Sequence, residues 1–215
     1  MRRVIPGFIP AFLALGATVV SAQHISPRTV IEHVEGKVYV DGQLLDPPWA
    51  SNFGKRGGSV VRTEAGRAVV RLEGGILFLG ENSSVKVIDR PYAPMQFGML
   101  TGSAVVMTDE TRIGTAAVVA CEEPVTLSSS GVYRFDAETI VSPTQGNYSY
   151  CRFRVYKGAA AVQLPSFISV LTSGKTMNLN HTCGDHIPTG VFDIEEIDGL
   201  DRWSRQRVGS DPGRL

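Results

Sequence analysis

Two histidines and a cysteine near the C-terminal end of the chain have the spacing of a compact metal site. They read His181-x-Cys183-x-x-His186, with Asp185 beside the second histidine. Imidazole, thiolate and carboxylate groups bind zinc and copper. However, a loop would have to wrap tightly around the ion, and the pattern names no fourth ligand. We therefore predict that the protein holds no metal or other cofactor. A metal-dependent protein or enzyme centred on His181, Cys183 and His186 is the alternative.

Other patterns that could carry catalysis are incomplete. Ser173-Gly174-Lys175-Thr176 resembles the end of a phosphate-binding loop, but Ser169 stands where that motif needs a glycine. The residues after it are strand-like, so no helix N-terminus would face a phosphate. A nucleophile elbow of the form Gly-x-Ser-x-Gly does not occur. We therefore predict that the protein is not an enzyme.

The N-terminus has the features of a secretory signal peptide. Arg2 and Arg3 precede an apolar run from Ile9 to Val20, and Val20-Ser21-Ala22 fits a cleavage site before Gln23. The apolar run is too short for a comfortable membrane span. We predict residues 1–22 to be the signal peptide and the mature protein to be periplasmic or secreted.

Composition favours a β-rich body without nucleic-acid binding. The chain has 21 Lys+Arg against 21 Asp+Glu, so it offers no basic surface for a nucleic acid. Glycine and valine are frequent and helix formers are sparse between Gln23 and Thr182. These features are typical of strands joined by tight turns.

The stretch from Val60 to Val87 organises the expected sheet. Arg67 to Leu72 alternates between polar and apolar residues, which indicates a half-buried strand. We expect a tight turn at Ala65-Gly66 before it and a hairpin at Gly74-Gly75 after it. The predicted core residues of the two strands around the hairpin are Val70, Leu72, Leu77 and Leu79.

A glycine followed by a valine-rich strand recurs along the chain, and two readings are open. Each copy could be a repeat unit that opens with a turn, or the pattern could simply be common in β proteins. We also expect hairpins at Asp41-Gly42 and at Ser173-Gly174 and a turn at Lys157-Gly158. The glycines that carry the recurrence are Gly36, Gly66, Gly102, Gly131 and Gly158.

The C-terminal segment has the pattern of one helix. Asp193 with Glu196 three residues later fits an N-cap box, and Ile197, Leu200 and Trp203 form an apolar stripe. We therefore predict an all-β fold, a sandwich or flattened β-roll of short repeat-like strands with one C-terminal α-helix. The all-β domain is expected over residues 23–187, and the helix and a frayed tail over 188–215.

The stretch from Val61 to Val85 also resembles the FecR domain, an extracytoplasmic module. The matching positions are strand and turn residues and carry no chemistry. The match extends over about residues 30–179, and the segment 200–207 is similar to the tail of FecR-domain proteins of acidobacteria. The positions that carry it are Val61-Arg62-Thr63, Gly66, Ala68, Val70, Leu72, Leu79-Gly80, Asn82-Ser83-Ser84 and Val85.

The resemblance implies a non-enzymatic binding or scaffolding module of the bacterial envelope. FecR proteins control a sigma factor through an N-terminal cytoplasmic segment, whereas here only a few residues precede the apolar run. We therefore do not expect regulation by that route. The expected partner is another envelope protein or polymer, bound through strand edges and loops such as Trp49 to Gly58. A purely structural envelope protein is a further alternative.

Three cysteines allow three single disulfides and leave one thiol over. Cys121 ends one apolar strand and Cys151 begins another, and two such strand ends can lie at one edge of a compact sheet. Cys183 lies in the connection to the helix. We favour a Cys121–Cys151 bridge, with Cys151–Cys183 as the pairing that would show the placement of Cys121 to be wrong.

Overall fold

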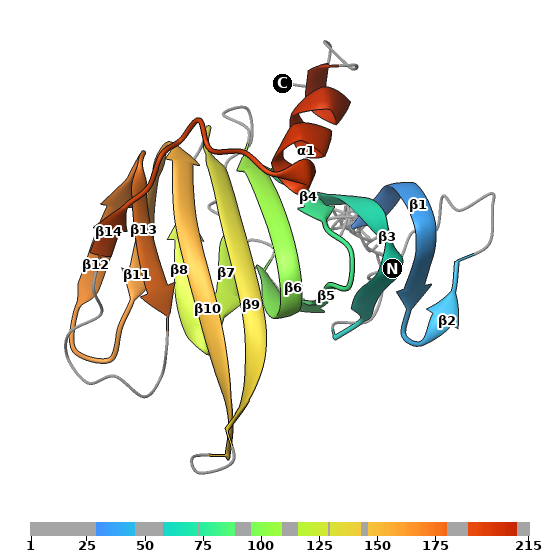
Figure 1. Cartoon of the computed structure of the whole chain (residues 1–215), viewed down its shortest axis with the longest axis horizontal. Helices are drawn as coiled ribbons and strands as arrows, with labels where there is room; N and C mark the ends of the chain where they lie inside the picture. Colours follow the sequence, from blue (N-terminus) through green and yellow to red (C-terminus); the bar gives the residue numbers. More distant parts are fainter. Residues whose placement is uncertain are drawn as a thin grey trace, which may run out of the picture.

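The computed structural model describes residues 29–45, 58–72, 74–88, 96–108, 116–128, 130–142, 146–179 and 189–209. Within these residues the chain forms fourteen strands and one C-terminal helix, which confirms the predicted all-β class (Figure 1). The described part contains no helix with the length and apolar content needed to span a membrane. The elements are β1 (Val30–Val40), β2 (Gln43–Leu44), β3 (Val60–Leu72), β4 (Gly75–Leu79), β5 (Ser84–Ile88), β6 (Gln96–Thr108), β7 (Ala117–Ala120), β8 (Glu123–Leu127), β9 (Val132–Ser142), β10 (Gly146–Lys157), β11 (Ala159–Gln163), β12 (Ile168–Thr172), β13 (Lys175–Leu179), β14 (Thr189–Val191) and α1 (Gly199–Gly209).

The strands fold into two layers that share the long strands β3 and β6. The first half of β6 pairs with β5 and β7, and its second half pairs with β4 and β9. β3 divides in the same way between β5 and β4. One layer therefore continues through β7, β8, β11 and β12, and the other through β9, β10, β13 and β14. In Figure 1, β7 and β8 lie behind β9 and β10, so the layer that continues through β7, β8, β11 and β12 is called the rear layer and the other the front layer. This two-layered arrangement, a flattened roll, fits the predicted class of a sandwich or flattened β-roll with one C-terminal helix.

Glycines in the long strands allow two backbones to approach closely, and they do not open turns there. Gly36 of β1 faces Gly66 of β3. A Cβ on Gly66 would lie 2.4 Å from the carbonyl oxygen of Glu35, so only glycine fits. β3 runs without interruption through this position. The predicted tight turn at Ala65-Gly66 is therefore wrong.

The recurring glycine pattern has no single structural meaning. Gly102 lies inside β6 with φ at +83°, where the strand passes from one layer to the other. Gly131 and Gly158 instead lie just before β9 and β11. The reading that each copy opens with a turn is therefore wrong. The other reading holds, that a glycine followed by a strand is simply common in β proteins.

Side chains of the central strands alternate between the space inside the roll and its outer face. The predicted core residues Val70, Leu77 and Leu79 are each at most 1% exposed and lie in the large core between the layers. The side chain of Leu72 lies outside the described residues. The residues next to Val70, Leu77 and Leu79 along the strands, such as Val69 and Phe78, are also buried, but on the outer face beneath α1. The outer face of β3, β4 and β6 is therefore a second, smaller core.

The predicted hairpins are only partly right. The turn at Asp41-Gly42 joins β1 to β2, with both residues at positive φ, and Gly74 joins β3 to β4. Gly174 also lies in a turn, but β12 pairs with β11 whereas β13 pairs with β10. The last predicted hairpin is therefore wrong, because this turn passes between the layers. The strand after the turn at Gly158 likewise pairs with β8 and β12.

Helix α1 begins later than predicted, because its N-cap is Asp198 and not Asp193. Asp198 Oδ1 accepts the backbone N–H groups of Leu200 at 2.8 Å and Asp201 at 3.0 Å. Asp201 Oδ2 in turn accepts the N–H of Asp198 at 3.2 Å, which completes a reciprocal capping box. Asp193 instead caps a short turn by accepting the N–H of Glu195. The prediction of Asp193 as the helix N-cap is wrong.

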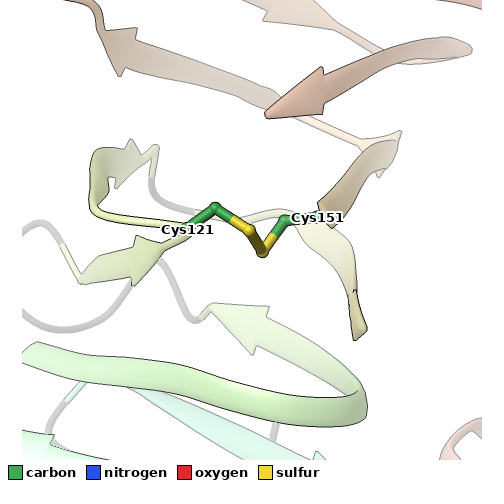
Figure 2. Close-up of a disulfide and its surroundings, with 2 residues drawn as sticks. All are labelled: Cys121 and Cys151. Atoms are coloured by element: carbon green, nitrogen blue, oxygen red, sulfur yellow. A yellow bond between two sulfur atoms is a disulfide. The ribbon is translucent and has the colours of Figure 1, made fainter. Parts of the chain in front are cut away.

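The predicted disulfide between Cys121 and Cys151 is present (Figure 2). Its Cα atoms are 5.8 Å apart, and both residues are almost fully buried. Cys121 lies in the tight turn between β7 and β8, and Cys151 lies within β10. The bridge therefore links the two layers across the core, and the expectation that both cysteines lie at one edge of the sheet is wrong.

Candidate functional site

The predicted metal-site residues cannot be placed. His181, Cys183 and His186 lie outside the described residues, as does nearly all of the loop from Trp49 to Gly58. Among the residues that the structure does describe, no three His, Cys, Asp or Glu side chains are grouped so that they could hold a metal. The absence of a metal centre in the whole chain therefore stays a prediction.

Strand β12 forms an apolar edge of the rear layer. Among the described strands, it pairs only with β11. The side chains of Ile168 and Val170 are 60% and 67% exposed, and Phe167 just before them is 45% exposed. Leu171, which points to the other face, is 1% exposed and belongs to the core. The strand is thus fixed by its inner face and presents apolar side chains beside backbone groups that can still pair.

The other layer ends in a much shorter edge strand. β14 covers only Thr189–Val191 and pairs with β13. Val191 is 76% exposed, and the preceding Gly190 has no side chain to contribute. Short edge strands are a common protection against unwanted strand pairing. β12 therefore differs from β14 in length and in apolar surface.

A buried arginine organises the outer face of the front layer. Arg134 on β9 is 5% exposed at its side chain and contacts three carboxylates. Its Nε donates to Asp136 at 3.0 Å, its Nη2 lies 2.6 Å from Asp198 Oδ2, and its Nη1 lies 2.9 Å from Asp201 Oδ2. Burial alone would lower the pKa of Arg134, because it disfavours the charged guanidinium. The hydrogen bond and charges of the carboxylates have the larger effect and raise that pKa.

Arg134 thereby attaches the first turn of α1 to the sheet. Burial alone would raise the pKa of Asp198, but the hydrogen bond and charge of Arg134 and the helix N–H groups hold it far below its usual range. Tyr156 on β10 donates its hydroxyl to Asp201 Oδ2 at 3.1 Å. Burial, together with the negative charge of Asp201, raises the pKa of Tyr156 to about 12. The cluster positions a helix and offers no acid–base pair for catalysis.

The far end of α1 has a second polar attachment. Trp203 Nε1 donates to Glu35 Oε1 at 3.0 Å, and Arg207 also pairs with Glu35 on β1. The ring of the same Trp203, in the middle of the helix, packs edge-on against Phe78, with ring centroids 5.8 Å apart. The helix is therefore fixed at its start, middle and end.

Sequence reasoning missed both the β12 edge and the arginine cluster. Ile168 and Val170 alternate with Ser169, but the same pattern occurs in any half-buried strand. The alternation of Arg134 with apolar neighbours on β9 predicts an outward side chain and does not indicate what covers it. Only the second acidic pair, Asp198 and Asp201 at the start of the apolar stripe, was a usable signal for the helix start.

Two crystal structures are similar to part of this chain, each of a provisionally assigned anti-sigma factor from Parabacteroides distasonis. Their TM-scores are 0.47 and 0.48, at 14% and 13% sequence identity. The aligned regions cover 62% and 63% of this chain but only 59% and 60% of those chains. No protein-family model and no curated protein matches the chain. We therefore argue its function from its own residues.

Proposed function

We propose that the protein is a non-enzymatic, FecR-like binding module of the bacterial envelope that takes up an extended segment of a partner protein along the edge of β12. The observation that carries this proposal is the exposure of Ile168 and Val170 on a strand whose second edge pairs with none of the described strands. Strand addition supplies main-chain hydrogen bonds, and alternate side chains supply selectivity. The partner segment should therefore be extended and carry apolar residues at every second position.

The residues that carry the FecR resemblance have structural roles, which fits a binding module without catalytic chemistry. The hydroxyl of Thr63 donates to the Gly80 carbonyl and accepts the N–H of Ser83 at 3.0 Å. Ser83 Oγ in turn accepts the N–H of Ser103 at 2.8 Å. These bonds hold together the corner where β3, β5 and β6 meet.

The disulfide supports a location outside the cytoplasm. Cys121 and Cys151 are bonded across the core, and such bridges persist in oxidising compartments such as the periplasm. This agrees with the predicted signal peptide, whose removal after Ala22 can be checked by the intact mass of protein recovered from the envelope.

Site-specific photo-crosslinking in envelope preparations tests the proposal. A benzophenone amino acid at position 170 should give a crosslink that maps by mass spectrometry to one contiguous segment of another protein. The same probe at position 191, a similarly exposed valine on the other edge strand, is the matched control. Val170→Lys should abolish co-purification of that protein, whereas Val191→Lys should not. Crosslinks equal at both positions, or only to a second copy of this chain, would contradict the proposal.

A further inference from the structure

We propose that the outer face of β10 and β13 carries a binding site for a small zwitterion with an apolar side group, such as an apolar amino acid or dipeptide. The site is a groove of about 450 Å³. Its floor comes from β10 and β13, and its wall comes from the connection between β14 and α1. The site is separate from the β12 edge, and the inference does not rest on the proposed function.

The floor of the groove is rich in hydrogen-bond donors. Arg152 lies directly opposite Asn178, and Arg154 lies opposite Thr176, in the β10–β13 ladder. All four side chains point outward, because their neighbours along both strands are buried in the core. Directly opposed residues have Cβ atoms about 5 Å apart, so Arg152 and Asn178 can contact the same ligand group. A guanidinium with a neighbouring amide is suited to bind a carboxylate.

Arg152 is the groove cation that remains accessible. It is exposed, and a hydrogen bond with Tyr150 together with nearby negative charge raises its pKa, so it stays charged. Arg154 is committed to Asp136, because its Nη2 lies 2.6 Å from Asp136 Oδ2. The carboxylate of a ligand is therefore assigned to Arg152.

Two acidic residues of the wall are already engaged by a protein cation. Asp198 and Asp201 both pair with the buried Arg134, which offsets one of their two negative charges. Asp198 is half exposed but pairs with Arg134, whereas Glu196 is an exposed carboxylate of the wall outside the Arg134 cluster. The groove thus presents an accessible cation on its floor and an accessible anion on its wall, a pattern that matches the carboxylate and ammonium of a zwitterion.

The summed charge disfavours a simple anion. Three arginines face four carboxylates in and beneath the groove, which gives a net charge of −1. A zwitterion has no net charge to be repelled, whereas an organic anion would meet a weakly unfavourable field. The residues counted are Arg134, Arg152, Arg154, Asp136, Glu196, Asp198 and Asp201.

The wall also supplies an apolar contact for a ligand side group. Phe192 and Ile197 line the groove. The Phe192 ring is positioned by an edge-on contact with Tyr156, with ring centroids 5.0 Å apart. It lies 5.9 Å from the guanidinium carbon of Arg154. Small-ligand pockets combine apolar and aromatic side chains with a few placed polar groups, and Phe192 and Ile197 supply the apolar part here.

Calorimetric titration of the purified protein with matched probes tests the site. The probes are both enantiomers of phenylalanine and the dipeptide Ala-Phe, with hydrocinnamate and phenethylamine as analogues that lack the ammonium or the carboxylate. We expect saturable binding of at least one zwitterion and binding at least about tenfold weaker for both analogues, the usual loss for a charge-assisted hydrogen bond. No saturable binding of any zwitterion up to roughly 10 mM would overturn the proposal.

Two variants separate a zwitterion site from an anion site. Arg152→Gln and Glu196→Gln should each weaken zwitterion binding by about tenfold or more and leave the melting temperature unchanged, because both side chains are exposed. The matched controls are Arg202→Gln and Glu195→Gln, exposed residues of the same charge outside the groove. Tighter binding of hydrocinnamate after Glu196→Gln, with zwitterion binding unaffected, would assign a simple anion site and contradict the inference.

Discussion

The apolar side chains that point away from the interior of the roll fall into two regions, one covered and one open. Phe78 and Val105 on the outer face of the front layer are each 1% exposed, because α1 lies over them. Ile168 and Val170 on β12 are 60% and 67% exposed. The chain thus covers one apolar surface with its own C-terminal helix, while in the described residues the other has no such cover (Figure 1).

The difference shows which surface serves the fold and which is available for a partner. The covered region combines apolar contact with two polar attachments, Arg134 to the helix start and Glu35 to its second half. Such a combination fixes one orientation of the helix, since each charged group has a defined partner. The β12 edge offers apolar side chains and a backbone edge that no described strand occupies, which suit an incoming strand.

The largest expected effect is on the covered region. Trp203→Ala should lower the free energy of unfolding by about 3–5 kcal/mol, because it removes a buried aromatic ring from the contact with Phe78. Urea denaturation followed by circular dichroism measures it. Arg202→Ala, at an exposed position of the same helix, is the control and should change stability by less than about 0.5 kcal/mol. Equal, small effects of both substitutions would show that α1 is not docked.

Removing the cation beneath the helix should have a somewhat smaller effect. Arg134→Met removes the counter-charge that Asp198 and Asp201 share, whereas Asp136 keeps its pair with Arg154. We expect a loss of about 3 kcal/mol, at the low end for a broken buried pair because Asp198 is half exposed. Adding Asp198→Asn and Asp201→Asn to Arg134→Met should recover part of the loss. A triple variant less stable than Arg134→Met would contradict the ion-cluster account.

Alkaline pH should weaken the covered region through ionisation of Tyr156. The pKa of Tyr156 is raised to about 12, so its contribution to stability is complete below the ordinary tyrosine pKa near 10 and is lost as pH rises through 12. The loss is at most about 2.7 kcal/mol by linkage. Unfolding of the wild type and Tyr156→Phe should therefore differ in slope between pH 10 and 12. Parallel curves would show that Tyr156 does not titrate with folding.

The open region should tolerate polar substitution with almost no change in stability. Ile168→Thr and Val170→Thr are expected to change the free energy of unfolding by about 0.5 kcal/mol or less, since both side chains are already in water and threonine suits a strand. Thermal denaturation measures the effect. A loss similar to that of Trp203→Ala would mean that β12 is covered and that the contrast between the two regions is wrong.

Local patterns in the sequence predicted the features that depend on neighbouring residues. The alternation around Val70 predicts which side chains enter the core, and Asp41-Gly42 predicts a hairpin, because two residues at positive φ define that turn. The turn at Ser173-Gly174 has the same local signal, yet β12 and β13 pair in different layers. Pairing across layers is a tertiary property, so the sequence could not distinguish these two turns.

Positions decided by distant residues were predicted poorly. Asp193 and Asp198 both precede an acidic residue by three positions, and Arg134 on β9 selects the second as the helix N-cap. Glycine in a sequence often indicates a turn, but position 66 requires glycine because the backbone of β1 approaches it closely. The β12 edge was not predictable as a site, because only the strand order makes it an end strand.

Residue-resolved hydrogen exchange of the purified protein tests most directly whether β12 is an open edge. The account predicts that alternate backbone amides of Ile168–Thr172, those not paired with β11, exchange rapidly at neutral pH. The amides of Gly75–Leu79, paired on both sides beneath α1, should be strongly protected in the same sample. Uniform protection along β12, equal to that of β4, would show that another part of the chain covers this edge and would contradict the account.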